Sequence, residues 1–348
     1  MDLFDEDVGS QPSPKPRRGK GTAQVEAADG DAALEQIAQG LAPGVHLGTS
    51  SWSFPGWRGL VWRGEHSESQ LSRQGLAAYS RHPLLRCVSL DRSFYRPLSA
   101  SEYATYAAQV PENFRFVVKA PSLVCDAVVR GSDGRGLQDN PAFLDPALAL
   151  SEFVQPAVDG LGTRIGALVF QLSPLPRPQL ERLDTVLDRL AAMLAALPRL
   201  DAVAPGAVVA VEVRNPEFLS PEFARILKAA GATYCLGLHP RMPPIEEQLP
   251  MLRALWPAPL VCRWSLNRKH GAQGYGEAKG LYEPFDRLQD PDPATRRVLA
   301  KVIAATSGAA LPVYITVNNK AEGSAPLSVV ELARELGGAR PAATDSVD

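Results

Sequence analysis

Eight short apolar segments, each ending on a polar or charged residue, constrain the fold of this chain more than any other feature of its sequence. They are rich in Val, Ile, Tyr and Cys and are bounded by Gly or Pro, as buried parallel strands are. The segments begin at Val45, Arg86, Phe114, Ala167, Val208, Thr233, Leu260 and Val313. Stretches long enough for a helix separate them, so the sequence predicts an α/β fold, a single TIM-type (β/α)8 barrel. Such barrels carry their active sites at the carboxyl ends of the strands, where these polar residues stand.

The rest of the chain fits one barrel with two tails. Residues 1–28 hold an acidic start followed by a Pro-rich basic stretch, and neither buries enough apolar surface to order itself. We therefore expect a disordered N-terminal tail over 1–28, the barrel over 29–338 and a disordered C-terminal tail over 339–348.

Helix signals lie between the strands. A Ser-Pro start at Ser220 and a stop at Gly231 predict one helix. A polar start at Ser67 predicts another. A leucine stripe predicts a helix that covers the sheet with one face. Its members are Leu180, Leu183, Leu187, Leu190 and Leu194. The long Gly- and Lys-rich segment after the seventh strand is typical of a lid or binding loop.

Composition argues against several classes of protein. The formal net charge of -2 gives no electrostatic reason to expect nucleic acid or an anionic membrane as the main partner. No apolar stretch approaches the length of a membrane span, and Met1 is followed by an acidic segment rather than by a signal peptide. We therefore expect a cytoplasmic protein whose four scattered cysteines are reduced and buried.

Strand parity predicts which side chains share the barrel mouth. Side chains two apart lie on one face, so Glu212 and Arg214 point into the mouth together, while Val211 and Val213 face the helices. Other strand ends complete a polar ring. They contribute Ser89, Asp91, Lys119, Gln171, Arg263, Asn318 and Asn319. The mixture suits a small polyhydroxylated or anionic ligand, because Arg and Lys bind carboxylate or phosphate while Asn and Gln bind hydroxyls.

Three residues are candidates for catalysis. Glu212 is the expected acid/base, and the alternative is a structural ion pair with Arg214; neighbouring cations lower its pKa, whereas a dry pocket raises it. Lys119 either forms a Schiff base or clamps an anion beside Glu212. Asp91 is either the second carboxylate of a glycosidase-like pair or the N-cap of the turn that follows.

Substrate-binding candidates lie around these three. Arg214, Gln171, Arg263, Asn318, Asn319 and Lys320 are polar residues at strand ends, and Trp52, Tyr95 and Arg96 follow the first two strands. The aromatic rings either stack on a sugar or base, or plug the barrel top. Arg96 is expected to bind a carbonyl or carboxylate. Gly323 and Ser324 precede a helix, so free N–H groups there are expected to hold an anion.

No cofactor is predicted. Of the five histidines His239 alone ends a strand, and the sequence holds neither HExxH nor CxxC. We expect His239 to be a core or rim residue. A Mg²⁺ ion between Asp91 and Glu212 stays an open alternative.

The strand-end motifs as a set resemble the YecE-like family, also called domain of unknown function seventy-two. The motifs are GTSSWSFPGWRGLVW, SFYRPLS, FRFVVKAP, FQLSP, VEVRNP and VNNKAEGSAPLS, which run from about Val45 to Gly338. The resemblance implies a (β/α)8 barrel and brings no established reaction. Against the family pattern the chain has lost protonatable groups at Ser89, Asn215 and Ser265. It is therefore either a subgroup with shifted chemistry or a barrel that binds without turnover.

Together these features predict an enzyme that acts by acid/base chemistry on a small polar or anionic metabolite, carbohydrate-like or phosphorylated. Hydrolase, lyase and isomerase activity are not distinguished. A non-catalytic ligand-binding or scaffold barrel is the alternative. Metal-dependent nucleic-acid processing is a third reading, which the near-neutral charge and the scarcity of strand-end histidines oppose. The expected partner is a small molecule, and no membrane partner is expected.

Overall fold

A closed barrel of eight parallel strands forms the centre of the protein. The computed structural model describes residues 24–131 and 136–338. Around the barrel the strands follow in the order β1, β2, β3, β6, β7, β8, β9 and β10, and β10 pairs with β1. Their bounds are Val45–Thr49, Cys87–Leu90, Arg115–Lys119, Ile165–Gln171, Val208–Glu212, Thr233–Leu238, Leu260–Trp264 and Val313–Val317. The predicted TIM-type barrel and its eight strands are confirmed.

Small and branched side chains, together with one tyrosine, fill the barrel interior. They form a cluster separate from the outer core: Val117, Ala167, Val169, Val208, Ala210, Cys235, Val261 and Tyr314. Every residue of the eight barrel strands is buried except Arg115 at the start of β3, because helices cover the barrel from outside. At Gly48 the neighbouring strand comes so close that a Cβ atom would stand 1.8 Å from the carbonyl oxygen of Cys87. Glycine is therefore required where β1 approaches β2.

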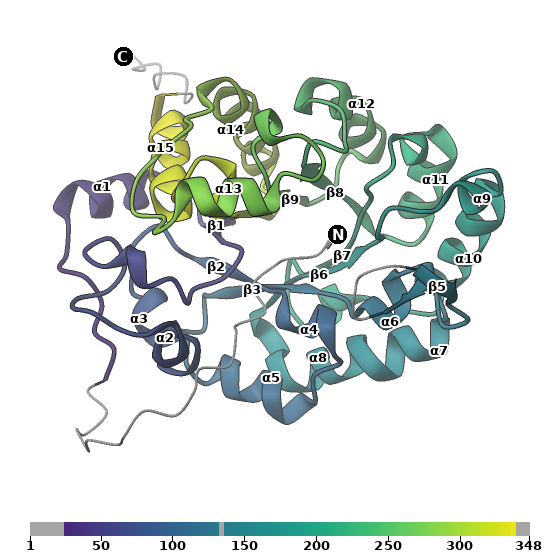
Figure 1. Cartoon of the computed structure of the whole chain (residues 1–348), viewed down its shortest axis with the longest axis horizontal. Coiled ribbons are helices and arrows are strands. Elements are labelled where there is room, and N and C mark those ends of the chain that lie inside the picture. The colour runs from purple at the N-terminus through teal and green to yellow at the C-terminus, as the bar shows by residue number, and fades with distance from the viewer. Residues whose placement is uncertain (1–23, 132–135, 339–348) are drawn as a thin grey trace, which may run out of the picture.

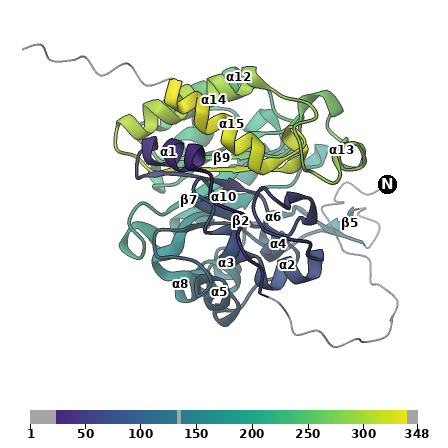
Figure 2. The same cartoon turned by 90° about the vertical axis from the view of Figure 1, so that its left-hand side faces the viewer.

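Helices surround the barrel on its outside, as Figures 1 and 2 show. α5 and α8 pack together on one side, and α14 and α15 pack together on the opposite side. The helices in the first half of the chain are α1 (Ala32–Gly40), α2 (Glu68–Gln74), α3 (Leu76–Tyr79), α4 (Arg92–Tyr95), α5 (Ala100–Ala107), α6 (Ser122–Cys125), α7 (Pro146–Ala149) and α8 (Gln155–Leu161). Those in the second half are α9 (Arg177–Leu180), α10 (Leu183–Ala195), α11 (Pro221–Ala229), α12 (Ile245–Leu255), α13 (Tyr275–Tyr282), α14 (Pro293–Gly308) and α15 (Ala325–Gly338).

The local helix signals work as predicted. The Ser67 hydroxyl accepts from the backbone N–H of Gln70 and caps α2, and Ser220 caps α11 in the same way. Gly231 ends that helical segment with a φ of 65°. On α10 the leucine stripe is buried at positions 187, 190 and 194. The stripe is interrupted at its start, because α9 ends at Leu180 and α10 begins only after Arg182.

Two features differ from the expected organisation. The ordered body begins before residue 29, because Val25 is buried and Ala27 forms a bridge to Trp62; the expected tail boundary at residue 28 is wrong at this end. The segments 1–23 and 339–348 lie outside the described residues. A small antiparallel hairpin, β4 (Val128–Arg130) with β5 (Gly136–Asp139), follows α6 outside the barrel, and the sequence pattern did not predict it.

The helices do not reach membrane-spanning dimensions. In the described part of the chain, none combines the length and the apolar character that crossing a bilayer requires.

Candidate functional site

Glu212 and Arg214 share the barrel mouth, as strand parity predicts. Their side chains form an ion pair with 2.7 Å between Oε1 of Glu212 and Nη1 of Arg214. Val211 and Val213 lie in the outer core instead. Glu212 has no exposed surface, and Arg214 keeps 7% of its surface exposed. The pair therefore sits at the floor of the mouth, with the arginine nearer to solvent.

Arg263 connects the polar residues of three other strand ends. Its Nη1 donates to Oε2 of Glu212 at 2.7 Å and to Oε1 of Gln171 at 2.8 Å. Its Nη2 donates to both carboxylate oxygens of Asp91, at 3.0 and 2.9 Å. Arg263 is itself buried. The guanidinium fork thus joins β9 to the ends of β2, β6 and β7 across the barrel.

Asp91 has a different role from either interpretation of the sequence. It precedes α4, but its side chain makes no capping hydrogen bond to that helix. It accepts instead from Arg263 and, at 2.6 Å, from the Ser89 hydroxyl. Because one guanidinium binds both Asp91 and Glu212, the two carboxylates do not flank an open gap for water and a sugar. The same guanidinium occupies the place where a Mg²⁺ ion between them would have to bind.

Glu212 is held in its ionised form. Burial alone would raise the pKa of this carboxyl, but Arg214, Arg263 and Lys119 together lower it below its usual value. An ionised carboxylate has no proton to donate, and both oxygens of Glu212 are already paired, Oε1 with Arg214 and Oε2 with Arg263, so neither is open to take a proton from a substrate. The geometry therefore favours the structural ion-pair network over the acid/base role.

Lys119 lies beside this network at the end of β3. Its ammonium group stands 3.7 Å from the centre of the Phe94 ring, a cation–π contact, and the residue is buried to 3% exposure. It also lines the main cavity of the mouth. Its place beside Glu212 and this cavity fits the anion-clamp interpretation.

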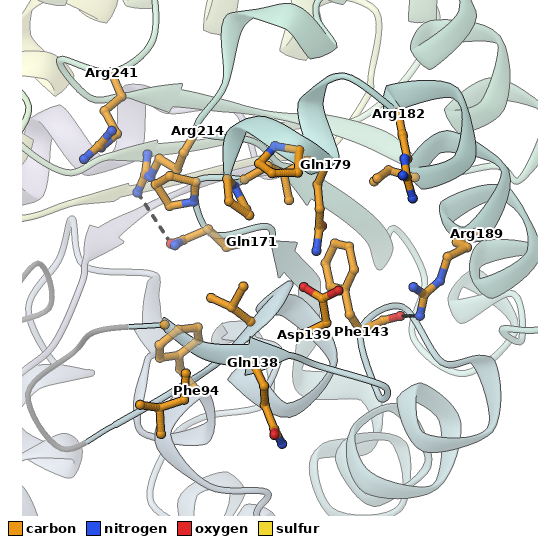
Figure 3. A pocket seen from close by; sticks show the side chains of 18 of the residues that line it. Phe94, Gln138, Asp139, Phe143, Gln171, Gln179, Arg182, Arg189, Arg214 and Arg241 are labelled. Atoms are coloured by element: carbon orange, nitrogen blue, oxygen red, sulfur yellow. Dashed lines mark hydrogen bonds between the residues drawn. The ribbon is translucent and has the colours of Figure 1, made fainter.

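The main cavity opens over these strand ends and measures about 850 Å³. At its inner end the polar lining residues are Lys119, Gln171, Arg214, His239 and Arg241. Figure 3 shows Arg214 and Arg241 on one side of Gln171, with a hydrogen bond from Arg214 to the Gln171 side chain. Three cations at this end face the cavity without a carboxylate among their lining neighbours. The inner end is therefore positive.

Most of the other predicted residues line a smaller cavity of about 330 Å³. Trp52, Asp91, Tyr95, Asn318 and Lys320 line it. Tyr95 also lines the main cavity, so the two cavities adjoin at this exposed ring. The Trp52 ring is buried and its Nε1 donates to the Leu71 carbonyl at 3.2 Å, which favours the plug over the stacking platform.

Four predicted residues line neither cavity. Arg263 and Glu212 lie beneath the surface of the mouth. Arg96 points away from it, where it donates to the Pro97 carbonyl and pairs with Glu102, which fits the predicted carbonyl or carboxylate contact. Asn319 is buried, and its side-chain oxygen accepts from Nε1 of Trp57 and from the backbone N–H of Ala325.

The turn before α15 is closed to ligands. Asn319 already occupies the N–H of Ala325, and Ser324 has no exposed surface. The Glu322 carboxylate fills the same region and pairs with buried Arg296. The prediction that this helix start holds an anion is wrong, because the chain's own polar groups take its place.

His239 is a lining residue that sequence reasoning set aside. Its Nδ1 accepts from the backbone N–H of Arg241 at 3.0 Å, so the proton is on Nε2. Burial first, and then the charges of Arg214, Arg241 and Arg268, lower the pKa of His239 from 6.5 to about 2. The ring is therefore a neutral hydrogen-bond donor at the cavity wall. The position of His239 at the end of a strand was the feature of the sequence that could have indicated a place in the barrel mouth.

One departure from the family pattern shapes the same wall. The side-chain oxygen of Asn215 accepts from the backbone N–H of Leu175 at 2.8 Å. Leu175 and its neighbours Pro174 and Pro176 line the main cavity. Asn215 therefore fixes the loop after β6 rather than contributing a protonatable group.

Metal ligands do not gather at this site. Among residues 24–131 and 136–338, no group of three or more His, Cys, Asp or Glu side chains is arranged to hold a metal ion.

Comparisons with known proteins agree with the fold. The sequence matches DUF72, described as a protein of unknown function, over residues 46–347. A crystal structure of a DUF72 family protein from Enterococcus faecalis is 18% identical, with a TM-score of 0.54 over 87% of this chain and 100% of that one. A second, from Thermotoga maritima, is 20% identical, with a TM-score of 0.54 over 84% of this chain and 99% of that one. A search of curated proteins finds no match.

Proposed function

The chain belongs to the DUF72 family of proteins of unknown function, and we propose that its barrel mouth binds a small anionic metabolite. One observation carries the proposal. Lys119, Arg214 and Arg241 converge on the inner end of the main cavity, at the strand ends where barrels bind their ligands. A phosphorylated or carboxylated sugar fits such a lining.

The ion-pair network supports this binding role. Glu212 and Gln171 hold the Arg214 guanidinium from beneath, through the 2.7 Å ion pair and the hydrogen bond to the amide oxygen. An arginine that is fixed before the ligand arrives loses little side-chain entropy on binding. Hydroxyl groups of the ligand find the Gln171 amide and the Nε2–H of His239 on the same wall.

Catalysis is the second candidate, and the state of His239 favours it. A neutral imidazole with a fixed N–H, next to Lys119 and Arg214, stabilises negative charge that develops on a substrate oxygen. In this mechanism Glu212 positions Arg214 and transfers no proton. The predicted acid/base role of Glu212 is replaced by electrostatic stabilisation.

A ligand screen tests the proposal. The full chain is heated with matched pairs of compounds, each a neutral sugar and its phosphate or carboxylate, at constant ionic strength. We expect the anionic member to raise the Tm by a few degrees at saturating concentration, because a ligand that binds only the folded state stabilises it. Calorimetric titration then gives Kd for the wild type and for Lys119→Gln and Arg214→Gln.

The variants separate the outcomes. Lys119→Gln and Arg214→Gln are each expected to weaken the anion about tenfold or more, while Arg225→Gln, which removes an exposed charge paired with Glu222, leaves Kd unchanged. Equal binding of the neutral and anionic partners would overturn the proposal. For any substrate found, turnover that survives Glu212→Gln and falls with His239→Phe supports the electrostatic mechanism; the reverse supports acid/base chemistry by Glu212.

A further inference from the structure

The main cavity does not end at the barrel mouth. It continues outward between the β4–β5 hairpin and the segment that holds α9 and α10. Figure 3 shows Arg182 and Arg189 at this outer end, on the far side of Gln179 from Arg214 and Arg241. Both outer arginines are exposed and line the same cavity as the inner cations.

α10 turns a selected face toward this outer end. Arg182, Thr185, Val186 and Arg189 line the cavity. Arg182 directly precedes α10, and Thr185, Val186 and Arg189 share one side of that helix, because residues three and four apart lie on the same face. Leucines on another side of the helix cover the barrel. The acidic residues of the same helix, Asp184 and Asp188, are exposed but do not line the cavity. The segment 182–189 thus presents its two arginines to the cavity and its two aspartates to solvent.

Arg189 is held in place at the cavity wall. Its guanidinium donates to the Phe143 carbonyl and lies 5.5 Å from the centre of the Phe143 ring. A guanidinium has five N–H donors, so one backbone contact leaves others for a ligand. Asp139 is the one carboxylate among the described residues that line this cavity.

Uncharged side chains make up much of the rest of the lining. Phe94, Val128, Leu175, Pro176 and Pro178 line the cavity along with the inner and outer cations. The whole volume of about 850 Å³ lies near the upper end of the range of ligand pockets, about 300–1,000 Å³. A single anionic group contacts the inner cations and leaves the outer arginines without a partner in the ligand. The lining therefore matches a longer molecule with a charge at each end.

We propose that the ligand of this cavity is elongated and carries two anionic groups joined by an uncharged spacer, the first bound by Lys119 and Arg214 and the second by Arg182 and Arg189. The proposal rests on anion binding at the barrel mouth and adds the ligand's length and its second charge.

Alkane bisphosphonates of increasing chain length serve as probes. Each is compared with the alkyl monophosphonate of the same length, by calorimetric titration of the full chain at fixed ionic strength. We expect one chain length to bind best, and at that length the bisphosphonate to bind about tenfold or more tightly than the monophosphonate, since the second charge gains its own partners.

Variants assign the second group. The double change Arg182→Gln and Arg189→Gln is expected to remove the bisphosphonate's advantage and leave the monophosphonate unchanged. Asp139→Asn removes the opposing carboxylate and is expected to tighten the bisphosphonate alone. Arg177→Gln is the matched control: Arg177 is exposed on neighbouring α9, pairs with Glu181 and does not line the cavity. It is expected to change neither probe.

The outcomes distinguish this inference from the proposed function. Equal affinities for the two probes at every length, with both weakened by Arg214→Gln, would overturn the second anion site and leave binding at the mouth in place. No binding of either probe would overturn both. A bisphosphonate advantage that Arg177→Gln reduces as much as the double change does would also overturn the assignment, because it would reflect general surface charge.

Discussion

Replacing Arg263 by methionine removes the group that neutralises both carboxylates of the barrel mouth. Arg263 makes four hydrogen bonds, to Gln171, Glu212 and Asp91, at 2.7–3.0 Å. Methionine keeps an unbranched apolar side chain but no charge. Glu212 then loses one of its two direct ion-pair partners inside a site with no exposure. Breaking a buried ion pair from one side costs about 3–5 kcal/mol, so we expect the free energy of unfolding to fall by that amount.

Urea unfolding followed by circular dichroism measures the loss. We expect a lower midpoint with an unchanged m-value, because the same surface is exposed on unfolding. The control is Arg225→Met, whose pair with Glu222 is at least half exposed on both sides and is expected to contribute less than about 1 kcal/mol. Adding Glu212→Gln to Arg263→Met is expected to recover part of the loss, because a neutral amide does not need a counter-ion.

The pH dependence gives a second readout. In the wild type the pKa of Glu212 is lowered, so its stabilising contribution is present above the unfolded value of 4.5 and is lost as pH falls through the folded value. Without Arg263, burial is opposed only by Arg214 and Lys119, and the pKa rises. Acidification from pH 7 to pH 5 then favours the folded variant, so its deficit against the wild type is expected to shrink.

Two results would refute this reasoning. One is a loss below about 1 kcal/mol at pH 7, the size expected of an exposed pair. The other is a deficit that is the same at pH 7 and pH 5 and is unaffected by Glu212→Gln. Either would show that Arg263 does not neutralise Glu212.

Three further predictions concern the rest of the fold. Burial lowers the pKa of His46 and of His82 from 6.5 to about 4, so the unfolded chain binds more protons than the folded protein between pH 7 and pH 5. The free energy of unfolding, measured by urea titration, should therefore fall by about 2 kcal/mol per histidine from pH 7 to pH 5, and His82→Gln should make this fall smaller. Gly48→Ala should strongly destabilise the chain in thermal unfolding, since the new methyl group meets the Cys87 backbone, whereas Gly40→Ala, in open space, should not. Ser99→Ala removes the capping box of α5 and should cost about 1 kcal/mol, with an unchanged midpoint counting against the cap.

The barrel was predictable from the sequence because its signals are local. Each strand is a short apolar run, and each ends on a polar residue whose parity fixes its face. That is why Glu212 and Arg214 could be placed together in the mouth, and Val211 and Val213 outside it, without coordinates. The helix caps at Ser67 and Ser220 are local in the same sense.

The partners of these side chains were not predictable, because they depend on distances across the closed barrel. Arg263 was expected to bind substrate, yet its guanidinium group donates hydrogen bonds to side chains at three other strand ends within the protein. Asn319 was assigned to the same role, but it holds Trp57, 262 residues away along the chain, and the start of α15. No spacing in the sequence indicates either contact.

The outer end of the cavity escaped prediction for a different reason. α10 has two faces of interest, and the sequence shows only the apolar one that covers the barrel. Arg182 and Arg189 line a cavity only because the β4–β5 hairpin lies opposite them. The strands of this hairpin are too short and too exposed to give a clear sequence pattern. A cavity wall that depends on the segment opposite it cannot be identified from its own residues alone.

The charge of the mouth follows from how its residues are paired. Arg214 and Arg263 pair with the carboxylates of Asp91 and Glu212. Arg263 lies buried between both carboxylates, and Glu212 is hidden beneath Arg214, so Arg214 lines the main cavity together with Lys119. The carboxylates hold the arginines in position without presenting their own charge to the main cavity. This arrangement supports the proposed binding of an anion, and a proton-transfer role would need a carboxylate that Arg263 had released.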